Sequence, residues 1–64
     1  MAQVQFTTSN QVQLTINDNQ LVAVNIFGDI FKGQLNENGK VVAKSSLSLA
    51  VLSKAMLEYR NSIN

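Results

Sequence analysis

The stretch SLSLAVLSKAMLEYR, residues 46–60, decides the fold, because its apolar side chains recur at helical spacing. Steps of three and four residues place these side chains on one face of a helix. A hydroxyl group of Ser45 or Ser46 caps the first turn. A helix with so few caps and ion pairs depends on packing against other elements. The predicted buried face contains Leu49, Leu52, Met56, Tyr59 and Ile63, and Val51 and Ala55 widen it.

The residues before this helix alternate apolar and polar side chains between evenly spaced turns, near residues 10, 19, 28 and 38. A period of two residues is typical of strands with one buried face. We therefore predict one α+β domain over residues 1–64, an antiparallel β-meander of four to five strands with one C-terminal α-helix packed on one face. Strands are expected at about 2–8, 12–17, 20–27, 30–37 and 40–44, and the helix at about 46–60.

The turns set the register of neighbouring strands. A three-residue loop at 9–11, with Asn10 in the left-handed conformation, places Phe6 opposite Leu14 on one face. A second three-residue loop at 18–20 is predicted to bring Val22, Val24 and Ile26 onto the same face.

Two later turns contain glycine. Gly28 and Asp29 form a two-residue turn that pairs Phe27 with Ile30, or else one long strand continues through Gly28 with a bulge. The dipeptide 38–39, Asn-Gly, is the strongest turn signal in the chain. A two-residue turn at that position pairs Leu35 with Val42 and Glu37 with Lys40.

This register divides the apolar strand residues between two faces. The face under the helix is predicted to hold Val4, Phe6, Val12, Leu14, Ile16, Val22, Val24, Ile26, Phe31, Leu35 and Val42. The opposite face is predicted to hold an interface group of Leu21, Ala23, Phe27, Ile30, Val41 and Ala43. An exposed apolar group of this kind marks a protein interface, and a more strongly curled sheet is the alternative explanation.

Length and composition favour a self-associating protein. A chain of 64 residues without cysteine has a marginal core, so a homodimer or a larger homo-oligomer is expected. The formal net charge of +1 is lower than nucleic-acid binders usually have. The longest apolar runs are too short for a signal peptide or a membrane span, so we expect no membrane partner and a cytoplasmic location.

The side chains available for catalysis are few. The chain has no histidine or cysteine, which removes the usual general base, thiolate nucleophile and soft metal ligands. The acids Asp18, Asp29, Glu37 and Glu58 do not converge in the predicted register. We therefore predict no catalytic residues, no metal site, no cofactor and no enzymatic activity.

Single-stranded DNA or RNA binding is the main alternative function. Lys32 and Lys44 are expected on neighbouring strands, with Asn25 and Phe27 on the same side, and such a sheet binds phosphates and stacks bases. The predicted element order is similar to that of the single-strand-binding coactivator and Whirly group, a likeness of architecture that transfers no residue. The competing explanation is that both lysines are solubilising charges at the edge of the sheet.

The sequence therefore favours a small non-enzymatic, self-associating protein that acts by protein–protein interaction, as regulators and inhibitors do. Binding of single-stranded nucleic acid through the sheet face is the first alternative. A structural subunit of a larger assembly is the second.

Overall fold

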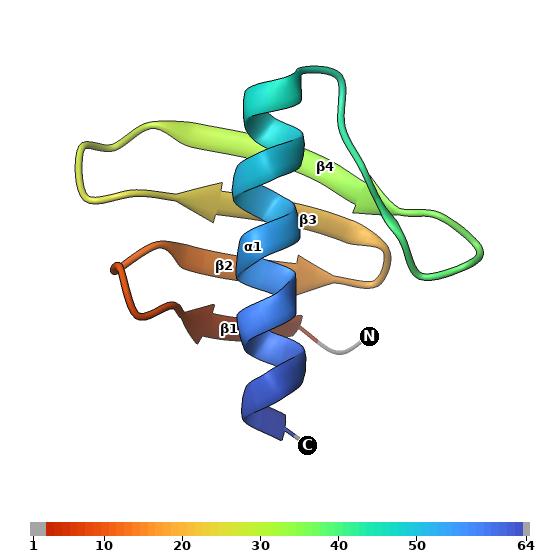
Figure 1. Cartoon of the computed structure of the whole chain (residues 1–64), viewed down its shortest axis with the longest axis horizontal. Coiled ribbons are helices and arrows are strands. Elements are labelled where there is room, and N and C mark those ends of the chain that lie inside the picture. Colours follow the sequence, from red (N-terminus) through yellow and green to blue (C-terminus); the bar gives the residue numbers. More distant parts are fainter. Residues whose placement is uncertain (1–2, 64) are drawn as a thin grey trace.

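The computed structural model describes residues 3–63, in which one helix crosses one face of a five-stranded antiparallel sheet (Figure 1). The strands lie in the sheet in chain order, β1-β2-β3-β4-β5. This arrangement confirms the predicted α+β fold and the antiparallel meander. The bounds are Gln3–Thr7 for β1, Gln13–Asn17 for β2, Gln20–Val24 for β3, Ile30–Leu35 for β4, Val41–Val42 for β5 and Ser46–Ile63 for α1.

Helix α1 begins with a hydroxyl cap and buries the middle of its apolar face. The Oγ of Ser45 accepts the backbone N–H of Ser48 at 3.0 Å, which satisfies one of the free donors of the first turn. Most of the predicted face is confirmed, but Leu49 and Ile63 are 39% and 63% exposed. The core consists of Leu14, Leu21, Ala23, Leu52, Ala55 and Met56.

Gly33 of β4 lets the helix approach the sheet closely. A Cβ atom at this position would lie 2.6 Å from Cδ1 of Leu52 and 2.8 Å from the carbonyl oxygen of Val42. Both distances are shorter than van der Waals contact, so a side chain here would force the helix or the neighbouring strand away. The glycine therefore fixes where α1 lies on the sheet.

Two of the four connections between strands share one loop design. In loops 25–29 and 36–40 the first residue is an asparagine whose Oδ1 accepts the backbone N–H groups two and four residues later, at 2.9–3.0 Å. The fourth residue is a glycine with positive φ, 85° at Gly28 and 79° at Gly39. Glycine adopts this conformation without steric cost. The pattern Asn-x-x-Gly-x therefore encodes a three-residue hairpin loop with a bulge.

The loop between β1 and β2 follows the same plan with different side chains. The N–H of Thr8 donates to the carbonyl of Val12 at 2.9 Å, and the Thr8 Oγ1 accepts the N–H of Val12 at 3.1 Å. Gln11 has the positive φ of 66°, so the prediction that Asn10 adopts the left-handed conformation is wrong. The predicted three-residue loop is confirmed, and so is the pairing of Phe6 with Leu14.

The turn between β2 and β3 is shorter than predicted. Asn17 pairs with Gln20, which leaves a two-residue turn rather than the predicted three-residue loop at 18–20. Asp18 supplies the positive φ of 55°, a conformation that Asp and Asn adopt more readily than most residues. A slip of one residue moves every side chain of a strand to the other face.

The two later turns also differ from the prediction. Val24 pairs with Ile30, so Gly28 neither forms a two-residue turn with Asp29 nor lies in a continuous strand, and both predicted alternatives are wrong. Leu35 pairs with Val41 instead of Val42. The asparagines close both loops: Asn25 pairs with Asp29 where Phe27 and Ile30 were expected to pair, and Asn36 pairs with Lys40 where Glu37 was expected.

These pairings reverse the predicted faces of β3 and β5 and leave β1, β2 and β4 as predicted. The side chains that pack on the core under the helix include Val12, Leu14, Ile16, Leu21, Ala23, Phe31, Leu35, Val41 and Ala43. Four residues predicted for that face, Val22, Val24, Ile26 and Val42, are therefore not part of the core.

Candidate protein-binding surface

The face of the sheet opposite α1 is bare, because within residues 3–63 the only helix lies on the other face (Figure 1). Strand alternation places mainly amide and hydroxyl side chains on this bare face. Its strand residues are Gln3, Gln5, Thr7, Gln13, Thr15, Asn17, Gln20, Val22, Val24, Ile30, Lys32, Gln34 and Val42.

The β3–β4 end of the sheet carries an apolar patch, which we define as Val22, Val24 and Ile30 on the bare face and Ile26 and Phe27 in the adjoining loop. Val24 and Ile30 are paired on β3 and β4, and the loop that joins these strands adds Ile26 and Phe27. Ile26 is 65% exposed, Phe27 82% and Ile30 61%. Contiguous exposed apolar groups of this kind mark interaction sites.

The predicted interface group is only partly on this surface. Phe27 and Ile30 are exposed as expected, but Leu21 and Ala23 are buried in the core. Val41 and Ala43 also pack against the core, so the prediction that these four residues lie on the face opposite the helix is wrong. Sequence reasoning missed Val22 and Val24, because a three-residue loop at 18–20 was expected, and the two-residue turn places them opposite the helix.

The two lysines of the nucleic-acid alternative do come together. Lys32 and Lys44 line the same depression at the β4–β5 side of the sheet, with Gln20 and Gln34. The side chain of Asn25 is already engaged within its loop. Its Oδ1 accepts two backbone N–H groups, and its amide donates to the Asp29 carboxylate at 3.2 Å. It holds its own loop instead.

Aromatic side chains are scarce on the bare face. Phe6 and Tyr59 contact each other between β1 and the helix, and Phe31 packs against the core. Phe27 is therefore the one exposed aromatic among the described residues. This limits base stacking, which single-strand binders use repeatedly.

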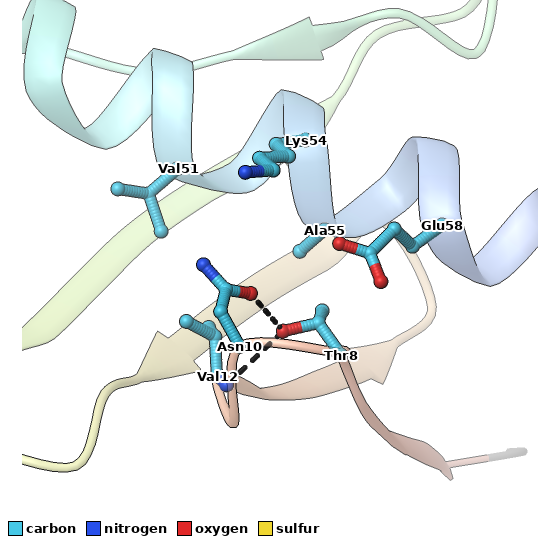
Figure 2. A pocket seen from close by; sticks show the side chains of 7 residues that line it. All are labelled: Thr8, Asn10, Val12, Val51, Lys54, Ala55 and Glu58. Atoms are coloured by element: carbon cyan, nitrogen blue, oxygen red, sulfur yellow. Dashed lines mark hydrogen bonds between the residues drawn. The ribbon is translucent and has the colours of Figure 1, made fainter.

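A second, small pocket of about 80 Å³ lies between the β1–β2 loop and the helix (Figure 2). Thr8 is 5% exposed there, and its hydroxyl donates to Asn10 Oδ1 at 2.7 Å. Glu58 accepts the backbone N–H of Ser9 at 2.9 Å and ties the loop to α1. Among residues 3–63, no buried side-chain nitrogen or oxygen lacks a hydrogen-bond partner. The polar groups at this pocket therefore serve to hold the β1–β2 loop against the helix.

The acidic residues lie apart from one another. Asp18 is in the β2–β3 turn, Asp29 and Glu37 are in the two asparagine loops, and Glu58 contacts Ser9. In the described part of the chain, no three His, Cys, Asp or Glu side chains are close enough to hold a metal ion. None of its helices has the length and apolar character needed to cross a membrane.

Comparison of the chain with protein-family models, with curated proteins and with solved structures found no match.

Proposed function

We propose that this chain is a small non-enzymatic, self-associating binding protein of the regulator or inhibitor type, which occludes or bridges a protein partner. The observation that carries the proposal is the apolar patch at the end of the bare sheet face. Phe27 in the loop and Ile30 on β4 are 82% and 61% exposed.

The composition of the bare face supports protein binding. The centre of a protein interface is poor in charged residues, and a polar rim surrounds it. Lys32, which pairs with Val22, is the one charged residue among the strand positions of this face. Gln13 and Thr15 border the patch on the β2 side. Neutral amides and hydroxyls lose less on desolvation than charges do.

The size of the face also supports it. The molecule extends 30 Å and 26 Å along its two longer axes, and the sheet lies in that plane (Figure 1). A standard interface buries about 800 Å² on each partner. A stable complex is therefore expected to cover most of the bare face, because the apolar patch alone is too small for an interface of that area.

Affinity capture with matched variants tests this proposal. Ile30→Asp places a charge in the patch, whereas Leu57→Asp places one at a similarly exposed residue of α1, since the two side chains are 61% and 60% exposed. We expect wild type and Leu57→Asp to retain the same partner and Ile30→Asp and Phe27→Asp to lose it. A partner retained equally by all four proteins contradicts the proposed surface. Large homogeneous assemblies without a partner would favour a structural subunit.

Single-stranded nucleic-acid binding is the second candidate, because Lys32 and Lys44 line one depression. Two cations at one site attract a phosphate backbone, and the affinity of such binding falls steeply with salt. Light scattering with a mixed single-stranded oligonucleotide at low and moderate salt tests it. A complex that dissociates as salt rises and is lost in Lys32→Glu/Lys44→Glu supports this candidate. Absence of a complex at low salt rejects it.

A further inference from the structure

The two edges of the sheet differ in how they are protected. β5 is two residues long, and a short edge strand offers few backbone groups for pairing. β1 is five residues long, and within residues 3–63 only β2 pairs with it. Its sequence, QVQFT, has neither a charged residue nor a proline, the devices that proteins use to prevent edge pairing. The sheet therefore has one edge suited to adding a strand.

Helix α1 extends beyond this edge. Tyr59 contacts Phe6 of β1, the last strand, and the helix continues past β1 (Figure 1). Ile63 lies one turn after Tyr59 on the same side of the helix, yet it is 63% exposed. One helical turn advances about 5.4 Å, and the next strand of a sheet would lie about 4.8 Å away. A strand added to β1 would therefore lie beneath Ile63.

We propose that a second copy of this chain adds its own β1 antiparallel to β1, giving a continuous ten-stranded sheet with both helices on one face. The inference rests on the self-association included in the proposed function and assigns it to the β1 edge. The partner strand presents Val4 and Phe6 on the helix side, so each copy supplies apolar side chains beneath the other copy's Ile63. One symmetric contact then covers both uncharged edges and both exposed isoleucines.

A second copy fits better than an open chain of copies. Since the β5 edge is short, pairing through β1 uses the one extended edge and closes at a dimer. A chain of 64 residues also gains from a larger shared core. The two bare faces then lie on the same side of the joined sheet. The dimer therefore offers two apolar patches, one from each copy, to a partner.

Two variants test the edge by different routes. Ile63→Asp removes the apolar contact at a side chain that is exposed in the single chain. Gln5→Pro acts on the backbone: the N–H of Thr8 donates towards β2, so by strand alternation the N–H of Gln5 points outward. Proline there removes a donor of the outer edge without removing one that pairs with β2.

The controls carry the same charge at matched exposure. Leu57→Asp lies on the outer side of α1, and Ile30→Asp lies in the apolar patch, with exposed fractions of 60% and 61% against 63% for Ile63. Both controls leave the β1 edge and the end of the helix unchanged. Circular dichroism shows whether each variant keeps its fold.

Sedimentation equilibrium over a range of protein concentrations provides the measurement. We expect wild type, Leu57→Asp and Ile30→Asp to form dimers, and Ile63→Asp and Gln5→Pro to raise the dissociation constant by about tenfold or more. A wild type that stays monomeric, or a dimer that survives both edge variants, overturns the inference. A dimer lost in Ile30→Asp but kept in Ile63→Asp places self-association on the bare face and also overturns it. If Ile30→Asp still forms the dimer but no longer captures the partner, the surface that binds the partner is distinct from the β1 edge that forms the dimer.

Discussion

The rings of Phe6 and Tyr59 meet edge to face, with their centroids 5.5 Å apart and their planes at 65°. This contact joins the edge strand β1 to the C-terminal half of α1. The helix crosses the sheet from β4 to β1 (Figure 1), and it has an attachment at each side. Leu52 against Gly33 provides one near β4, and the aromatic pair provides the other at β1.

The aromatic pair is expected to contribute beyond the apolar area that it buries. Edge-to-face pairs are worth about 0.5–1.5 kcal/mol in double-mutant cycles. We expect Phe6→Leu and Tyr59→Leu each to lower the free energy of unfolding, and their combination to lower it by less than the sum. Urea unfolding measures all four corners of the cycle. Tyr59→Phe, which keeps the ring, serves as the control, and additive losses from the two leucine variants would contradict a specific ring contact.

Gly33→Ala is expected to destabilise the protein, although alanine is normally the better strand residue. The new methyl group would meet both Leu52 and the backbone carbonyl of Val42. Overpacking of this kind costs about 1–3 kcal/mol. Thermal and urea unfolding measure the loss. Shortening the helix side chain in Gly33→Ala/Leu52→Val should recover part of it, and an increase in stability on Gly33→Ala alone would contradict the close approach of the helix.

The asparagine loops provide a third prediction. In each loop one Oδ1 accepts two backbone N–H groups, and a hydrogen bond contributes about 0.5–1.5 kcal/mol. We expect Asn25→Ala and Asn36→Ala each to lower the free energy of unfolding by about 1–2 kcal/mol. Asn36→Asp keeps the acceptor and should lose less. Asn25→Asp should not, because it replaces the amide that donates to Asp29 with a second carboxylate.

The matched control for these loops is Asn61→Ala, at an exposed position of α1. A surface change of this type is expected to stay within about 0.5 kcal/mol of wild type. Equal losses at positions 25, 36 and 61 would show that the loop hydrogen bonds contribute nothing specific.

Much of the fold was predictable from local pattern. Alternation in β1 and β2 and helical spacing after residue 45 identify the elements, and the loop at 9–11 gives the observed pairing of Phe6 with Leu14. The face of β4 was also predicted correctly, but for the wrong reason. The wrong loop length at 18–20 placed the side chains of β3 on the wrong face of the sheet. The wrong turn at Gly28 introduced a second reversal, which returned Phe31 of β4 to the face where it lies.

The remaining errors come from turn chemistry. Apolar residues occur on both faces of β3, since Leu21, Val22, Ala23 and Val24 follow one another, so hydrophobic alternation cannot choose its register. The choice then rests on the turns, where Asp18 and the first asparagine of each later loop decide the length. A prediction based on Gly28 and Gly39 alone misses the asparagine three residues earlier. The error at 18–20 misplaces the side chains of β3, and the missed Asn36 misplaces those of β5.

The register of β3 is therefore the most informative feature to test by mutation. Leu21 is 1% exposed beneath the helix, while its neighbour Val22 lies on the bare face. Truncating a buried leucine costs about 2–5 kcal/mol, so Leu21→Ala is expected to destabilise the protein severely, and Val22→Ala to cost about 1 kcal/mol or less. Urea unfolding distinguishes the two registers, because a three-residue loop at 18–20 would reverse the order. The same pair separates fold from binding: Val22→Asp should leave the protein folded and weaken partner capture, whereas Leu21→Asp should prevent folding.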